Sequence, residues 1–195
     1  DNIAIGTTAM DGLTSGTYNI AMGVNAYGTA AAGSSNIAIG NTTMGGSLVT
    51  GAANIAIGST AADALLAGAC NIALGQDALG ASTTGCLNVA IGNLALGAGV
   101  TTGINNVAIG LSAMCLLTSG AENIAIGCHA LGRATNNSNN VAIGRCAMYG
   151  TQDDGDCNIA IGVSALGTGD VSGNDNVAIG RLALTALTTG ATNVA

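Results

Sequence analysis

The side chains in this chain that could do chemistry are few. His129 is the single histidine, and there are six cysteines: Cys70, Cys86, Cys115, Cys128, Cys146 and Cys157. Thiolates and an imidazole could bind Zn²⁺, but the paired C-x-x-C spacing that makes a zinc site recognisable is missing. Cys–His catalysis would need a third group to orient the histidine, and a pocket. We therefore expect no metal, no cofactor and no enzymatic activity.

The cysteines allow one other interpretation. Cys70 and Cys86 lie about one repeat apart, as do Cys128 and Cys146, so a disulfide between neighbouring repeats is conceivable. Each pair is offset by one position, which in a strand reverses the face on which the side chain lies. Isolated, small, apolar cysteines are therefore the favoured interpretation, and the oxidation state stays open.

Charged residues are sparse and mostly acidic. Ten acids stand against three arginines and no lysine, for a net charge of −7. A phosphate backbone or an anionic membrane surface requires clustered Lys and Arg, so we expect neither nucleic acid nor membrane as a partner. The acids Asp153, Asp154 and Asp156 surround Gly155 without a calcium-loop pattern, and we expect a solvated turn there.

The elements that must position these residues come from a repeat. The phrase Asn-Ile/Val-Ala-Ile-Gly recurs every 17 or 18 residues along the whole chain. Its asparagines are Asn2, Asn19, Asn36, Asn54, Asn71, Asn88, Asn106, Asn123, Asn140, Asn158, Asn176 and Asn193. We number positions in each repeat from this asparagine as place 1. Residues 1–195 therefore form one array of eleven full repeats and the start of a twelfth, with no separate caps.

Places 2 to 4 have the alternation of a strand. Place 2 is Ile or Val, place 3 is always Ala, and place 4 is nearly always Ile. Branched residues at places 2 and 4 share one face of such a strand, and Ala takes the other. Glycine at place 5 ends the strand with a residue that is free to turn.

A second apolar pair at places 8 and 9, as in Ala78-Leu79, predicts a second short strand returning across the repeat. A variable stretch follows, and glycine stands three residues before the next asparagine in all repeats except the one with Asn137. Because Asn is the commonest non-glycine residue in the left-handed region, we expect a positive φ at this position.

Copies of such a unit must stack to bury their apolar residues. The prediction is an all-β protein, a parallel β-solenoid (β-roll) with 17–18 residue rungs and two short strands per rung. Eleven rungs at about 4.8 Å give a rod of about 50 Å. The asparagines should form a ladder at one corner, since an amide both donates and accepts. A helix over residues 60–69 is the rival reading, but glycine at fixed intervals in the other repeats opposes it.

Alanine at place 3 predicts an interface. If the Ile pair faces the core, a row of alanines points outward, and a long apolar stripe usually marks association. We therefore expect rods to associate side by side along a stripe of Ala4, Ala21, Ala38, Ala56, Ala73, Ala90, Ala108, Ala125, Ala142, Ala160 and Ala178.

The phrase resembles the head repeats of trimeric autotransporter adhesins. It is still more similar to the Asn-Thr-Ala-Ile-Gly-Tyr-x-Ala-Leu…Thr-Thr-Gly-x-Asn repeats of phage tail fibres, which Asn123, Ala125, Ile126, Gly127, Ala130 and Leu131 match place for place. Thr83-Thr84-Gly85 matches the turn of those repeats. For the adhesins the resemblance implies a left-handed β-roll in which three chains wrap a common axis, and for the fibres it implies a shaft.

The hypothesis is therefore a fibre shaft or stalk of a phage tail fibre or a bacterial surface adhesin, extracellular or on a cell surface or virion. It would be a homotrimer or an end-to-end filament, with a receptor bound by regions outside this chain. The alternative is an ice-binding solenoid that uses ranks of Thr. An enzyme on a β-helix, such as a polysaccharide lyase, is the least favoured, because the three arginines are scattered.

Overall fold

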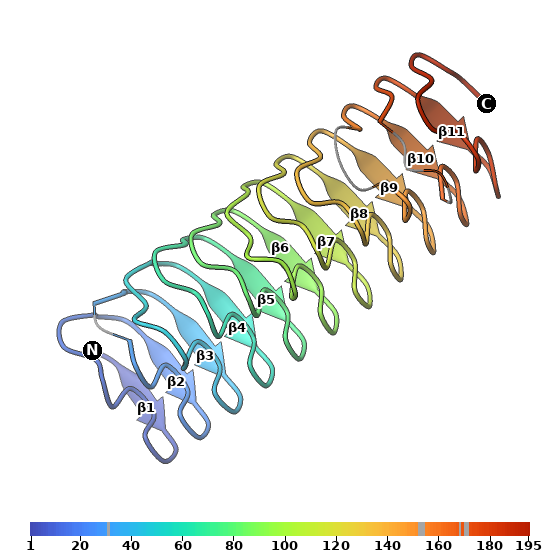
Figure 1. The fold of residues 1–195 in the computed structure, drawn as a ribbon. Coiled ribbons are helices and arrows are strands. Elements are labelled where there is room, and N and C mark those ends of the chain that lie inside the picture. The colour runs from blue at the N-terminus through green and yellow to red at the C-terminus, as the bar shows by residue number, and fades with distance from the viewer. Residues whose placement is uncertain (31, 152–154, 168, 170–171) are drawn as a thin grey trace.

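The chain winds into a rod of stacked rungs, each carrying one short strand (Figure 1). The computed structural model describes residues 1–30, 32–151, 155–167, 169 and 172–195. The strands are β1 (Ile3–Ile5), β2 (Ile20–Met22), β3 (Ile37–Ile39), β4 (Ile55–Ile57), β5 (Ile72–Leu74), β6 (Val89–Ile91), β7 (Val107–Ile109), β8 (Ile124–Ile126), β9 (Val141–Ile143), β10 (Ile159–Ile161) and β11 (Val177–Ile179). Each covers places 2 to 4 of its repeat. The predicted all-β solenoid is confirmed.

The eleven strands form one parallel sheet in which spatial order follows chain order. Register is identical at every step, so each place 3 alanine lies beside the place 3 alanine of the next rung, as Ala90 beside Ala108. Repeats of 17 and 18 residues keep this register because their length differs outside the strand. Identical side chains are therefore stacked along the rod.

The second strand predicted at places 8 and 9 is wrong. Residues at places 7 and 9 have a positive φ in every rung, for example Asp77 at 54° and Leu79 at 53°. These angles lie in the left-handed region, which no β-strand uses. Bonds between rungs persist all the same: the N–H of Leu79 donates to the carbonyl of Ala95 at 2.9 Å. Places 6 to 12 of each rung therefore form a wall of stacked turns, which we call the turn wall.

The two positions at which glycine recurs in the repeat require glycine for different reasons. At place 5 the glycines have φ between 128° and 139°, which side-chain-bearing residues rarely adopt. The glycine three residues before the next asparagine lies outside the positive-φ region, and so does Asn137, so that expectation was wrong. Close packing explains it instead: a Cβ on Gly103 would lie 1.9 Å from the carbonyl oxygen of Gly120.

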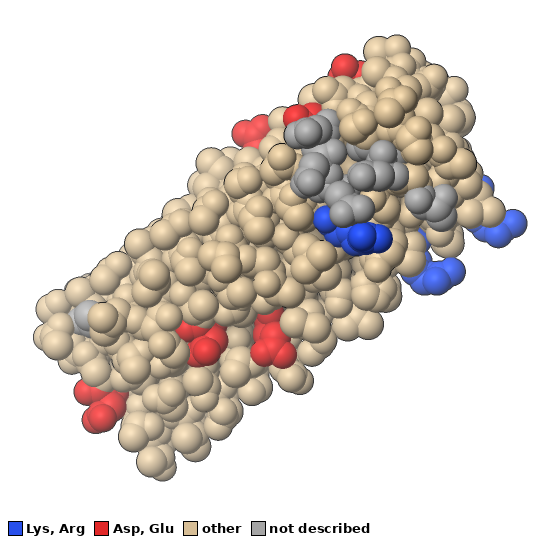
Figure 2. Space-filling view, in the orientation of Figure 1, with Lys and Arg blue, Asp and Glu red and all other residues tan. Residues whose placement is uncertain are grey.

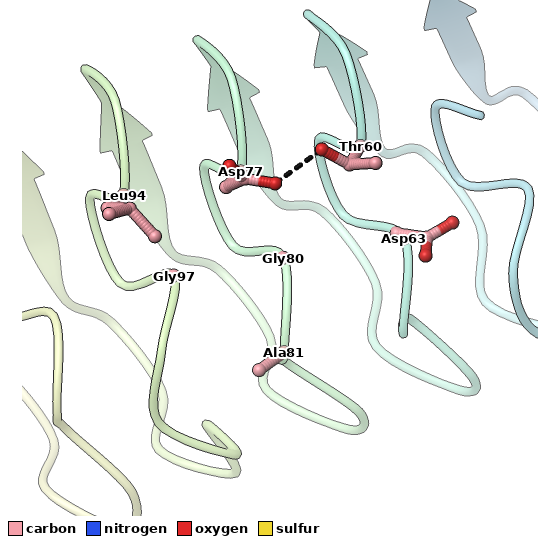
Figure 3. Close-up of a pocket in the computed structure, with 7 residues that line it drawn as sticks. All are labelled: Thr60, Asp63, Asp77, Gly80, Ala81, Leu94 and Gly97. Atoms are coloured by element: carbon pink, nitrogen blue, oxygen red, sulfur yellow. Dashed lines mark hydrogen bonds between the residues drawn. The ribbon is translucent and has the colours of Figure 1, made fainter. Parts of the chain in front are cut away.

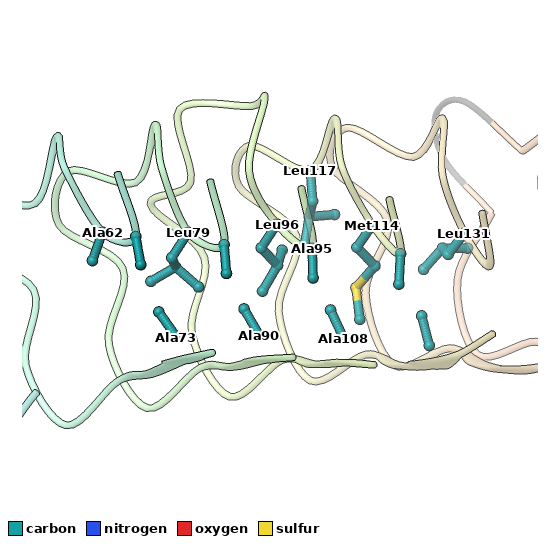
Figure 4. Packing of buried hydrophobic residues seen from close by; sticks show 14 of the residues in the cluster. Ala62, Ala73, Leu79, Ala90, Ala95, Leu96, Ala108, Met114, Leu117 and Leu131 are labelled. Carbon is teal, nitrogen blue, oxygen red and sulfur yellow. The ribbon is translucent and has the colours of Figure 1, made fainter. Parts of the chain in front are cut away.

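The core is thin and is filled from both walls (Figure 4). From the sheet side comes the row of place 3 alanines, all fully buried between β2 and β11. From the turn side come the residues at places 8 and 9, with Leu79, Leu96, Met114 and Leu131 above the alanines of the sheet. One small and one large residue therefore meet across the interior of each rung.

In rungs 2 and 4, residue volumes at places 9 and 12 compensate for each other. Rung 2 pairs the large Tyr27 with Ala30, whereas rung 4 pairs the small Ala62 with Leu65, and all four are buried. Because protein interiors are close-packed, the sum of the two volumes matters more than either one. Departures from the repeat at place 9 are therefore absorbed within the same rung.

Candidate functional site

The twelve asparagines stand in one file along the corner where each strand begins. In each of the eleven steps the backbone N–H of one asparagine donates to the side-chain Oδ1 of the asparagine below, at 2.8–3.0 Å. The Nδ2 group closes its own rung by donating to the carbonyl three residues before the next asparagine, as Asn71 to Gly85 at 2.8 Å. Asn71 is buried, and its amide is satisfied on both sides. The file holds the rungs together and offers no free group to a ligand.

The alanines predicted as an outward association stripe lie on the opposite face. Ala21, Ala38, Ala56, Ala73, Ala90, Ala108, Ala125, Ala142, Ala160 and Ala178 are buried inside the rod, and only Ala4 of the end rung is exposed. The prediction was wrong because the interior is narrow. Leu, Met or Tyr from the turn wall occupies most of it, so the strand can contribute only a methyl group.

The face of the sheet that does point outward is made of the branched residues at places 2 and 4. Their exposed fractions in the middle of the rod are moderate, as 39% for Ile124 and 37% for Ile126. Among the described residues, these two places hold only Ile, Val, Met and Leu in β1 to β11. We call this surface the outer sheet face. It is continuous because the register never changes.

The cysteines form no joint site. All six are free thiols. Cys86 Sγ accepts a bond from the N–H of Ala69, and Cys115 Sγ contacts the carbonyl of Gly132, with burial raising the pKa of the Cys115 thiol. The His129 ring packs edge-on against Tyr149 at 5.7 Å. In the described part of the chain, no three His, Cys, Asp or Glu side chains gather as metal ligands.

The predicted acidic turn is only partly visible. Asp153 and Asp154 lie outside the described residues. Asp156 is part of the rung-to-rung bonding, because its carboxylate accepts from the N–H of Ser138 at 2.7 Å and its own N–H donates to Asn174. This carboxylate is therefore used within the fold.

A hollow in the turn wall brings together residues of three rungs (Figure 3). It has a volume of about 320 Å³ and is lined by Thr60, Asp63, Asp77, Gly80, Ala81, Leu94 and Gly97. The Thr60 hydroxyl donates a short hydrogen bond to the Asp77 carboxylate one rung on. Glycine at place 10 of rungs 5 and 6 leaves the space open, whereas Asp63 fills that place in rung 4.

Asp63 is the carboxylate in this hollow with the more unusual surroundings. Burial raises its pKa above the ordinary value, the backbone of Gly46 and Gly45 lowers it, and the charge of Asp77 raises it further. One of its carboxylate oxygens, Oδ1, is buried without a hydrogen-bond partner in the structure. A cation that approaches the turn wall would stabilise the charged form of this carboxylate.

Sequence reasoning missed the hollow because its residues come from places 7 and 10 of different repeats, which only stacking brings together. It also missed Tyr27, whose hydroxyl accepts from Asn36 Nδ2 at 2.7 Å inside the rod. Burial, partly opposed by this bond, raises the pKa of Tyr27 to about 12. The available signal was its place: an aromatic residue in a row of Leu and Met.

Comparison of the chain with protein-family models, with curated proteins and with solved structures finds no match. The described part of the chain also contains no helix that could cross a lipid bilayer.

Proposed function

We propose that this protein is a stiff structural shaft that associates with copies of itself through the outer sheet face. The observation that carries the proposal is the continuity of this apolar face over all eleven strands. Each rung contacts only its neighbours, through the asparagine file and the core, so the rod has the mechanical character of a spacer.

The size of the face supports association. Eleven strands at about 4.8 Å spacing and three residues at about 3.3 Å give a flat area of about 500 Å². Monomers seldom leave an apolar patch larger than about 300–600 Å² exposed. Two copies face to face would bury about 1,000 Å² in total, which is near the lower limit for a specific interface.

The resemblance to fibre shafts and adhesin heads supports three chains around a common axis, and an extracellular, cell-surface or virion location. In a trimer each chain would contact two others, which increases the buried area per chain. An ice-binding surface receives no such support, because among the described residues no Thr lies in any of the strands.

The test is the native mass, measured by sedimentation equilibrium. The chain has a mass of 18.5 kDa, and we expect a fixed multiple of it, three for the proposed shaft. Substituting Ile109→Thr, Ile126→Thr and Ile143→Thr together keeps β propensity but places hydroxyls on the outer sheet face. At about 1 M salt, which screens attraction between charged groups, this variant should sediment as a monomer with an unchanged circular dichroism spectrum.

A matched control changes exposed apolar residues elsewhere: Leu48→Thr, Val100→Thr and Leu116→Thr, which lie in the loops and are 62%, 54% and 42% exposed. The control should keep the mass of the unsubstituted protein. A monomeric unsubstituted protein, or an Ile→Thr variant of unchanged mass, would show that the outer sheet face is not the interface.

A further inference from the structure

The turn wall carries a second surface, distinct from the outer sheet face, on which charge is divided along the rod. We define the charged edge as the side chains at places 6 to 11 of all rungs. It contains six charged residues: Asp11, Asp63 and Asp77 in rungs 1, 4 and 5, and Arg133, Arg145 and Arg181 in rungs 8, 9 and 11. All three cations of the chain are therefore in one half of this edge and all its anions in the other.

Figure 2 shows this division on one face of the molecule. The blue atoms gather over the C-terminal half, and the red atoms along the lower side gather over the N-terminal half. Arg133, Arg145 and Arg181 are exposed. Among the described acids of the C-terminal half, Glu122, Asp156 and Asp175 lie in the loops before the next asparagine, so they belong to another corner of the rung.

The middle of the edge, from place 7 to place 10, is narrow, and the arginines stand next to it in the chain, Arg145 and Arg181 at place 6 and Arg133 at place 11. A turn closes places 7 to 10, in which the N–H of Gly80 donates to the carbonyl of Asp77 at 3.1 Å and that of Gly97 to Leu94 at 3.1 Å. Side chains at places 7 and 10 therefore flank the same hollow. Height along the rod then decides which charges can meet.

We infer that a second copy of this chain docks on the charged edge in antiparallel orientation, with rung 6 of one copy opposite rung 6 of the other. In this arrangement rung 1 opposes rung 11, rung 3 opposes rung 9 and rung 4 opposes rung 8. Such a two-fold contact is self-complementary, because each pair of residues occurs twice.

The heights of the carboxylates match those of the arginines. Asp11 at place 10 of rung 1 lies at the same height as Arg181 at place 6 of rung 11 in the other copy. The carboxylate of Asp63 leans over rung 3, because a Cβ on Gly46 would lie 2.6 Å from its Oδ2, and rung 3 faces Arg145.

The third pair follows in the same way. The carboxylate of Asp77 leans toward rung 4, where it accepts the bond from Thr60, and rung 4 faces Arg133. Each arginine thus meets one carboxylate. An in-register parallel pair would instead place like charges side by side.

The most direct test is a zero-length carbodiimide crosslink. The chain has no lysine, so Arg181→Lys introduces its single ε-amine. Residues 11 and 181 are ten rungs apart, about 48 Å along the rod, so a bond between Asp11 and Lys at 181 can form only between copies. We expect this crosslink in peptide mass spectrometry, and its loss at about 1 M salt.

The contribution of charge is measured with two variants of equal net charge. Arg133→Gln, Arg145→Gln and Arg181→Gln together, and Thr84→Asp, Thr102→Asp and Ser119→Asp together, each lower the net charge of −7 by three. The first variant should weaken antiparallel pairing at least tenfold, and the second, changed only at exposed loop positions, less than threefold.

Both tests are repeated with Ile109→Thr, Ile126→Thr and Ile143→Thr in place, which separates the charged edge from the outer sheet face. Retention of the Asp11 crosslink in that background shows that the edge acts independently. Crosslinks from position 181 only to carboxylates of the same end of the rod, such as Asp175, or equal weakening by both charge variants, would overturn the inference.

Discussion

The two walls of the rod solve the same stacking problem in different ways. We call places 1 to 5 the strand wall and places 6 to 12 the turn wall. The strand wall has ordinary β geometry, an unvarying sequence and alanine inside. The turn wall has left-handed residues at places 7 and 9, a variable sequence and Leu, Met or Tyr inside. Both bond to the rungs above and below.

The difference in the size of the buried side chains shows which wall fills the interior. A parallel ladder fixes the backbone whatever the side chain, so the strand can be reduced to alanine on its inner face and still hold register. The turn wall is bonded from rung to rung through left-handed turns and not through a β-ladder, and large residues fill the interior from this side. The outer surfaces differ as well: that of the strand wall is apolar and continuous, whereas that of the turn wall mixes polar and apolar residues and is divided in charge.

Breaking the strand wall at its first residue should have the largest effect. Asn123→Ala leaves the N–H of Asn140 and the carbonyl of Asn137 without their partners, both buried. Two orphaned groups should lower the free energy of unfolding by about 4 kcal/mol. Chemical denaturation measures it, with exposed Asn93→Ala as a control expected below about 0.5 kcal/mol. Equal effects would mean that the asparagine file does not join the rungs.

A substitution at the corner that joins the two walls should have the next largest effect on the free energy of unfolding. Gly103→Ala sets a Cβ 1.9 Å from a backbone oxygen of the next rung, which should cost about 3 kcal/mol. Gly180→Ala is the comparison, because its added Cβ has nothing within 4 Å and only its φ of 132° opposes the change. A Gly103→Ala variant that is no less stable than the unsubstituted protein would show that close packing does not select glycine at this place.

The turn wall can be tested by pH through Tyr27. Its pKa is about 12 in the folded protein and about 10 when unfolded, so the neutral form is favoured by folding. This contribution is complete below pH 10 and is lost between pH 10 and 12, up to about 3 kcal/mol. Tyr27→Phe should flatten the fall in stability over that range. A fall that persists unchanged in Tyr27→Phe would place Tyr27 at the surface.

The smallest expected effect is an increase in stability. Asn137 stands where ten repeats have glycine, and its buried Oδ1 has no partner although its Nδ2 donates to Gly155 at 3.1 Å. Asn137→Gly keeps the carbonyl that Asn123 needs and removes the orphaned oxygen, so stability should rise by about 1 kcal/mol. A loss in thermal unfolding experiments would mean that the Nδ2 bond outweighs the orphaned oxygen.

The sequence predicted what a period can determine, and little more. Equal spacing of the asparagines was enough for the solenoid, the in-register sheet and the placement of strands at places 2 to 4. It was not enough to say which face is inside, because both Ala90 and Ile91 are apolar and alternation is symmetric between the faces. The decision depends on how much volume Leu96 brings from the opposite wall, which no local pattern shows.

The turn wall was the harder part for a related reason. Ala78-Leu79 has the composition of a strand, but left-handed φ values at Asp77 and Leu79 are imposed by stacking on both neighbours. The hollow at Asp63 and the division of charge along the edge follow from that stacking. Both features can be recognised once the position of each rung along the rod is known.

One pair of variants on β6 tests whether alanine points inward and isoleucine outward. Ala90→Val and Ile91→Ala are compared by urea denaturation at about 1 M salt, both with Ile109→Thr, Ile126→Thr and Ile143→Thr present, so that neither the outer sheet face nor the charged edge contributes assembly. We predict that Ala90→Val costs about 1–3 kcal/mol through overpacking, and Ile91→Ala less than about 1 kcal/mol. The reverse order, with Ile91→Ala costing about 2–5 kcal/mol and Ala90→Val almost nothing, would contradict the account.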